Sequence, residues 1–178
     1  MPFAQKRALP RLSKGAYKGS VSVFWTHSIE NRQTGWLDLT FHLKFRELLC
    51  HSLSRYKAIC PVYCLMPDHL HLLVTSIDDA SDQLQLNRFL RQELNKLLGP
   101  FRLQSQACDH VLRRNESDRE AFQSIAHYIL ENPVRKEICT VWTSYPYSGS
   151  SVPGYFDLDP RKDGYWELLW RIYSKLAQ

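Results

Sequence analysis

Two apolar segments separated by only two residues constrain the fold of this chain most strongly. Residues 58–66 (AICPVYCLM) and 69–75 (HLHLLVT) each have the length and the branched and aromatic content of a β-strand. Pro67 and Asp68, which lie between them, are residues that favour a tight turn. Because strands joined by so short a connection run in opposite directions, the sequence predicts an antiparallel hairpin.

The remaining sequence predicts further strands and helices around this hairpin. Alternation predicts a strand over residues 20–28, and helical spacing of apolar residues predicts one helix from about Asp38. Another helix is predicted to start at the polar residues Asp78, Asp79, Ser81 and Asp82. A short strand over residues 107–113 precedes a third helix that begins near Asp118. The Ser-, Gly- and Pro-rich residues 144–154 predict a linker to a last amphipathic helix from about Tyr165.

This order of elements favours an α+β fold. Strand, helix, strand, strand, helix, strand is the order of a ferredoxin-like split βαβ sandwich: an antiparallel sheet with helices on one face and additional C-terminal helices. We expect the other face of the sheet to be free for a ligand. A chain of 178 residues suits one compact unit, which we divide into a basic N-terminal arm (1–19), a central domain (20–150) and a C-terminal extension (151–178).

Charge indicates a polyanionic partner. The formal net charge is +5 at pH 7, and five cations precede the first acidic residue, Glu30: Lys6, Arg7, Arg11, Lys14 and Lys18. We expect this arm to add little to the core, to lie loosely on the protein, and to contact phosphates when nucleic acid binds. The second helix carries another basic stripe, which either follows a DNA backbone or is a solvated face: Arg88, Arg91, Asn95 and Lys96.

Hydropathy and cysteine content indicate the cellular compartment in which the protein is found. The N-terminus lacks the apolar run of a signal peptide, and no stretch is long and apolar enough to cross a bilayer. We therefore expect a cytoplasmic protein, nucleoid-associated if it binds DNA, with no membrane partner. Five cysteines without a CxxC pair argue against a disulfide framework and a zinc knuckle.

Two pairs of residues suggest chemistry. His69 and His71 flank Leu70 on a predicted strand, so both imidazoles point to one face and could chelate a divalent cation. On the third helix, Tyr128 lies at the edge of the apolar stripe, with Asn132 one turn further on the same flank. Pro133 should end this helix and leave the Asn132 side chain free to reach outward.

These segments resemble a known family. Residues 66–74 (MPDHLHLLV) resemble the metal-binding strand of the single-tyrosine HUH transposases, and residues 128–135 (YILENPVR) resemble the tyrosine segment of their REP-associated branch. The likeness extends more loosely over residues 20–150, with departures at Tyr147 and Gly149.

The resemblance implies a site and a reaction. His69 and His71 would be metal ligands, Asn132 a third ligand, and Tyr128 the nucleophile that forms a 5′-phosphotyrosine intermediate. The cofactor would be magnesium or manganese, and two imidazoles favour manganese. The partner would be single-stranded DNA with hairpins, such as repetitive extragenic palindromes, bound by a monomer or homodimer. The residues taken as DNA contacts are Lys14, Lys18, Arg88, Arg91, Lys96 and Arg135.

Three other interpretations compete with this one. A domesticated relative would bind hairpin DNA without cutting it, although it would not need all four candidate residues. A structural zinc would use the histidines, but no cysteine lies at a spacing that completes a four-ligand site. A replication initiator or relaxase would share the chemistry, but these proteins usually place the tyrosine differently and are longer.

Overall fold

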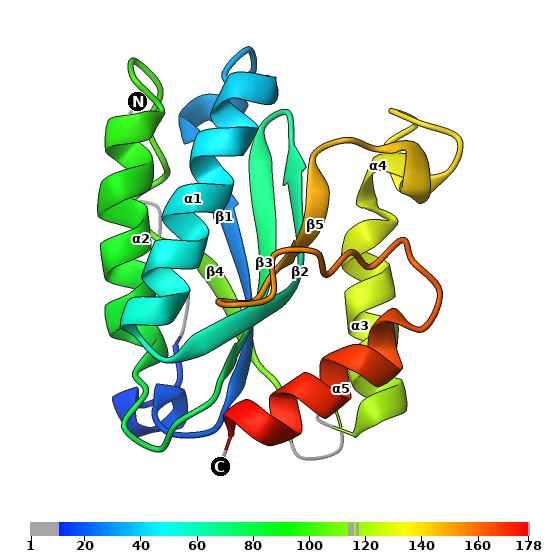
Figure 1. Ribbon diagram of the computed structural model, residues 1–178. Coiled ribbons are helices and arrows are strands. Elements are labelled where there is room, and N and C mark those ends of the chain that lie inside the picture. The colour runs from blue at the N-terminus through cyan, green and yellow to red at the C-terminus, as the bar shows by residue number, and fades with distance from the viewer. Residues whose placement is uncertain (1–10, 114–115, 117, 178) are drawn as a thin grey trace.

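The computed structural model describes residues 11–113, 116 and 118–177, which fold around one antiparallel sheet (Figure 1). The five strands are β1 (Ser22–Ser28), β2 (Ala58–Met66), β3 (His69–Ser76), β4 (Cys108–Val111) and β5 (Ser148–Ser151). Their order across the sheet is β4-β1-β3-β2-β5, and every neighbouring pair is antiparallel. The predicted α+β fold class is confirmed.

The predicted hairpin forms the centre of the sheet. β2 and β3 pair from Met66↔His69 to Ala58↔Ser76, and every residue of both strands is buried. Pro61 has no N–H to donate, and the pairing of β2 with both neighbours shifts register around it. Register decides which residues share a face, because directly paired residues point to the same side of a sheet.

Two helices cover one face of the sheet. α1 (Leu39–Arg55) and α2 (Gln83–Leu97) begin near the predicted starts, and Asp38 and Asp82 cap them by accepting hydrogen bonds from backbone amides of the first turns. Their apolar stripes bury Phe45, Leu49 and Leu90 against the strands. Together with the buried residues of the strands on this face, these residues form the main core.

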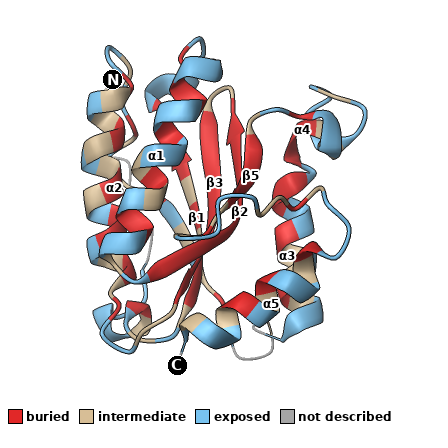
Figure 2. Cartoon of the chain, viewed as in Figure 1, coloured by how far each residue is buried: buried red, intermediate tan, exposed pale blue. Residues whose placement is uncertain are grey.

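The opposite face, expected to be free, is partly covered. α3 (Arg119–Leu130), the short α4 (Asn132–Arg135) and α5 (Tyr165–Leu176) lie on this side (Figures 1 and 2). Phe122, Ala126 and Ile129 of α3 pack with residues of β2, because an amphipathic helix must bury its apolar stripe. Among the described residues, the β1–β4 part of this face is the more accessible part: Phe24 and Thr26 are half-buried, and Cys108 and His110 are exposed.

The described part of the basic arm does not lie loosely on the protein. Residues 14–17 form a 3-10 helix, η1 (Lys14–Tyr17), and the Tyr17 side chain is fully buried in the main core. The Tyr17 hydroxyl donates to Asp109, which also pairs with Arg11 at 2.9 Å. The expectation of a loose arm is therefore wrong for residues 11–19, because one aromatic residue among the cations anchors the segment. Lys6 and Arg7 lie outside the described residues.

The predicted linker is also wrong in part. Within residues 144–154, Ser148–Ser151 form β5, an edge strand paired with β2. Gly149 permits this pairing, since a Cβ there would lie 2.8 Å from the Tyr63 hydroxyl. Beyond β5, Tyr165, Leu169 and Ile172 of α5 pack with Ile59 of β2, so the C-terminal extension is part of the packed structure.

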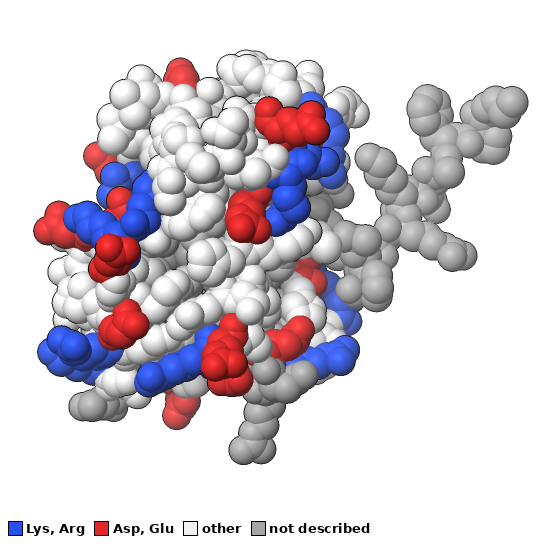
Figure 3. Space-filling model, turned by 90° about the vertical axis from the view of Figure 1, so that its right-hand side faces the viewer, with Lys and Arg blue, Asp and Glu red and all other residues white. Residues whose placement is uncertain are grey.

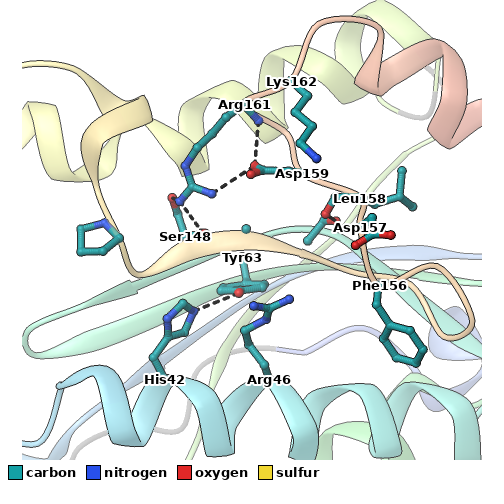
Figure 4. Close-up of a pocket in the computed structure, with 13 residues that line it drawn as sticks. His42, Arg46, Tyr63, Ser148, Phe156, Asp157, Leu158, Asp159, Arg161 and Lys162 are labelled. Carbon is teal, nitrogen blue, oxygen red and sulfur yellow. Dashed lines mark hydrogen bonds and ion pairs between the residues drawn. The ribbon is translucent and has the colours of Figure 1, made fainter.

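A hollow of about 340 Å³ lies between α1 and β5, and polar contacts connect several of the residues that line it (Figure 4). His42 and Tyr63 form its floor, with the imidazole Nε2 3.0 Å from the hydroxyl. On the opposite side of the hollow, Arg161 donates hydrogen bonds to Asp159 and to the carbonyl oxygens of Tyr145 and Ser148. These bonds tie the segment before α5 to the edge of the sheet.

Two buried histidines predict a loss of stability in acid. Burial lowers the pKa of His42 to about 4 and that of His27 well below its ordinary value. Both are neutral in the folded protein, whereas the unfolded chain takes up protons below about pH 6.5. The free energy of unfolding should therefore fall as the pH drops from about 6.5 towards 4, by up to about 1.4 kcal/mol per pH unit for each histidine.

Urea unfolding of the wild-type chain and of His42→Gln between pH 7 and pH 4 measures this effect. Glutamine keeps a hydrogen-bonding partner for Tyr63 but does not titrate, so its stability should decline less steeply. Parallel curves for the two proteins would show that His42 does not contribute.

Candidate metal centre and tyrosine nucleophile

His69 and His71 converge on one point, as their alternation predicts. They lie on the face of β3 that also carries α3, since β3 pairs Met66↔His69 and Cys64↔His71 with β2. Their Nε2 atoms are 3.1 Å apart, and the two residues are 8–9% exposed. The two rings are neither on opposite faces nor sealed in apolar packing.

Each histidine is oriented through its other ring nitrogen. Asp68 Oδ1 lies 2.6 Å from Nδ1 of His69, and Thr26 Oγ1 lies 2.9 Å from Nδ1 of His71. Partners of this kind fix the orientation and tautomer of histidines that bind metals. Burial, followed by the nearby charges of His69 and Arg135, lowers the pKa of His71 to about 3. His71 is therefore neutral near pH 7, the form that binds a cation.

The spacing of the two Nε2 atoms fits a shared cation. Two ligands at right angles, each about 2.1 Å from an ion, lie about 3.0 Å apart, close to the 3.1 Å found here. Within the described residues no three His, Cys, Asp or Glu side chains are grouped closely enough to hold a metal. Any ion bound by the histidines needs other donors, such as an amide oxygen, water or a phosphate.

Tyr128 is the tyrosine best placed to react with an external group. It lies on α3, which packs on the same face as the histidines, and its side chain is 54% exposed. By contrast, burial raises the pKa of Tyr17 to about 12 and raises the pKa of several others as well: Tyr63, Tyr145, Tyr165 and Tyr173. A phenol that resists ionisation inside the protein is a poor nucleophile.

Arg135 links Tyr128 with the histidine pair. Its guanidinium carbon lies 3.8 Å from the centroid of the Tyr128 ring, and Nη2 donates to the Tyr128 carbonyl oxygen. Its positive charge also lowers the pKa of His71. Arg135 therefore contacts Tyr128 directly and acts on His71 through its charge.

Asn132 differs from its predicted setting. It does not end the third helix with a free side chain but begins α4, because Pro133 fits the first turn of a new helix. Its side chain is buried, and Nδ2 donates to the carbonyl oxygens of Tyr128 and Ile129. This leaves the amide oxygen for a cation, although among the described residues Asn132 makes no hydrogen bond to either histidine.

Three contacts of the histidine pair were not predicted from the sequence. Thr26 reaches His71 only through the pairing of β1 with β3, and a residue that far away in sequence gives no local signal. Phe24 lies beside it on β1, with its ring centroid 5.3 Å from that of His71. Asp68 precedes His69 directly, so an acid next to the first histidine was a readable signal.

Four of the six predicted DNA contacts come together. Lys14 of η1 and Lys18, which directly follows η1, border the same surface as Arg88 and Arg91 of α2, in two adjoining hollows. Lys96 is outside these hollows and pairs with Glu93 at 2.6 Å. Arg135 lies instead with Tyr128, as described above.

The fold is similar to that of a solved structure. No protein-family model and no curated protein matches the sequence. Among solved structures, a REP-associated tyrosine transposase bound to a REP hairpin superimposes with a TM-score of 0.67 and 18% sequence identity, over 79% of this chain and 81% of the other. No helix among the described residues is long and apolar enough to span a membrane. The chain therefore has the fold of a REP-associated tyrosine transposase.

Proposed function

We propose that this protein is a metal-dependent DNA transesterase that cleaves and rejoins single-stranded, hairpin-containing DNA through a 5′-phosphotyrosine intermediate. One observation carries the proposal: two oriented histidines and an exposed tyrosine share one face of the sheet, and Arg135 contacts the tyrosine. The structurally similar transposase was solved with a hairpin bound, which supports the choice of substrate.

The residues divide the chemistry between them. His69 and His71, with the amide oxygen of Asn132, would hold a magnesium or manganese ion. Such an ion polarises a phosphodiester oxygen when it is bound. Tyr128 attacks the phosphorus in line, Arg135 holds the ring of Tyr128, and the half-exposed Phe24 offers a stacking surface for a base beside the histidines.

The proposed step balances without an external energy source. The phenolic oxygen of Tyr128 forms a bond to phosphorus and gives up its proton, while the bond from phosphorus to the 3′-oxygen breaks and that oxygen leaves as a hydroxyl. A phosphodiester is replaced by another phosphodiester, so a 3′-hydroxyl can reverse the reaction and join a strand. This is how the same site would both cut and rejoin DNA.

The proposal is tested by trapping the intermediate. The full chain is incubated with a single-stranded oligonucleotide that contains a hairpin and an unpaired 5′ tail, with manganese or with a chelator, and run on a denaturing gel. We expect a metal-dependent band at the mass of protein plus DNA. Tight hairpin binding without a covalent band at any metal concentration would favour the non-cleaving relative instead.

Arg135 gives a further prediction about the tyrosine. Removing the guanidinium should leave the ring free to rotate, so Arg135→Gln should lower the rate of adduct formation at saturating DNA by roughly 10- to 100-fold. Arg135→Lys should recover only part of this rate, since lysine keeps the charge but not the flat stacking group. The neighbouring exposed Lys136→Gln serves as the control. Equal rates for all three variants would contradict a positioning role.

A further inference from the structure

A basic groove runs between η1 and α2, on the other side of the sheet from the histidines. It consists of two adjoining hollows of about 440 Å³ and 380 Å³ that share Lys14, Leu84 and Arg88. Lys18 borders one hollow and Arg91 the other. Cations from two segments about seventy residues apart in sequence therefore line one continuous depression.

Most of this charge is not neutralised by protein carboxylates. Within the described part of the chain, Lys14, Lys18 and Arg88 form no ion pair. Arg91 contacts His27 and the Gln104 carbonyl oxygen instead of an acid. The one carboxylate lining the groove belongs to Asp82, which accepts from the amides of Leu84 and Gln85 at the start of α2.

The groove is also fixed in shape. Buried Tyr17 and its bond to Asp109 anchor η1, and Lys18 forms a backbone bridge with Asp82 at the start of α2. The lysines are thus presented by an anchored segment rather than by a free tail. Holding cations in place before binding reduces the ordering cost of binding an anion.

The groove suits a nucleic-acid backbone better than unpaired bases. Its three aromatic residues are already engaged: Tyr17 is buried in the core, and Arg55 lies over the rings of Tyr56 and Phe89, at 5.7 Å and 5.2 Å from their centroids. Single strands bind largely by stacking on open aromatic faces, whereas duplex backbones are held by cations and amides. Gln85, Arg88 and Gln92 line one hollow as a stripe on α2 that spans about 10 Å of helix, close to the rise of about three base pairs.

The charge pattern elsewhere sets this groove apart. On the face that carries α3 and α5, acidic and basic side chains are interleaved and much of the surface is neutral (Figure 3). The cations of the groove, by contrast, share the described lining of the two hollows with a single carboxylate, that of Asp82.

We propose that the groove between η1 and α2 binds the phosphate backbone of a DNA duplex, the paired stem of the hairpin substrate. The inference rests on the proposed function for the identity of the DNA. It assigns the stem to the groove and the unpaired strand to the face with Tyr128. Binding by the groove requires neither the metal ion nor cleavage.

The test compares three DNAs without metal: the hairpin, a blunt duplex with the sequence of its stem, and the unpaired tail alone. Binding of each is measured against salt concentration for the wild-type chain and for Lys14→Gln/Arg88→Gln. For the hairpin and the duplex, the double variant should weaken binding roughly 10-fold and flatten the salt dependence by about 0.9 in slope for each phosphate that the variant no longer neutralises. Binding of the tail should change less than two-fold.

Two controls keep the outcome interpretable. Lys44→Gln/Lys175→Gln removes the same charge from other exposed positions, and Lys14→Arg/Arg88→Lys keeps the charge in the groove, so both should bind the duplex like the wild type. Thermal unfolding checks that each variant is folded. Unchanged duplex binding by the glutamine variant, or an equal loss for the tail, would overturn the proposal. Because this test is run without metal and measures binding alone, failure of the groove and failure of the cleavage chemistry are distinguished.

Discussion

Replacing Tyr128 with phenylalanine should abolish the covalent protein–DNA complex, with the rate of adduct formation reduced by at least about 10⁴-fold. The substitution removes only the attacking oxygen and leaves the ring on which Arg135 stacks. Hairpin affinity should therefore stay within about two-fold of the wild type. Denaturing gels with labelled hairpin DNA, alongside equilibrium binding, measure the two quantities.

The matched control for this substitution is Tyr155→Phe. Tyr155 is also exposed, at 37%, but lies between β5 and α5 rather than on α3. It should form the adduct at the wild-type rate. An adduct that persists at a normal rate in Tyr128→Phe would mean that another residue attacks the DNA.

Removing either histidine should have the second-largest effect. His69→Ala and His71→Ala each delete one of the two converging Nε2 atoms, so adduct formation at a fixed manganese concentration should fall by on the order of 10³-fold. Thr26→Val removes only the partner that orients His71, and it should weaken metal binding roughly 10- to 100-fold. Higher metal concentration should rescue Thr26→Val but neither alanine variant.

Thermal unfolding provides a readout that does not depend on activity. A metal that binds only the folded protein raises its melting temperature, so manganese should stabilise the wild type and leave both alanine variants unchanged. His51→Ala, an exposed histidine on α1, should respond like the wild type. Equal stabilisation of all these proteins would place the metal elsewhere.

The central elements of the fold could be predicted because their signals are local. Ala58–Met66, the strand from His69 and the helix after Asp82 follow from apolar spacing, a two-residue turn and a capping aspartate. β5 could not be predicted, because Ser148–Ser151 contain no apolar side chain and form a strand only through pairing with β2. Tyr17 was likewise hidden among cations, and its burial depends on Trp25 and Asp109 from distant strands.

The features of the candidate site that depend on local sequence could be predicted, and those that depend on the second helix could not. Alternation placed His69 and His71 on one face, and helical spacing put Tyr128 at an accessible edge. The setting of Asn132 was wrong because a proline that ends one helix can equally begin the next. The contact of Arg135 with Tyr128 requires that second helix, so a single continuous helix could not have predicted it.

The central claim is that Tyr128 forms the covalent bond to DNA, and peptide mapping of the trapped adduct tests it most directly. Trypsin cleaves after Arg119 and Arg135, and the peptide of residues 120–135 contains a single tyrosine. After the adduct is trimmed with nuclease and digested, mass spectrometry should find a 5′-linked nucleotide on Tyr128 in this peptide. A nucleotide on any other peptide, or on Ser124 of this one, would contradict the account.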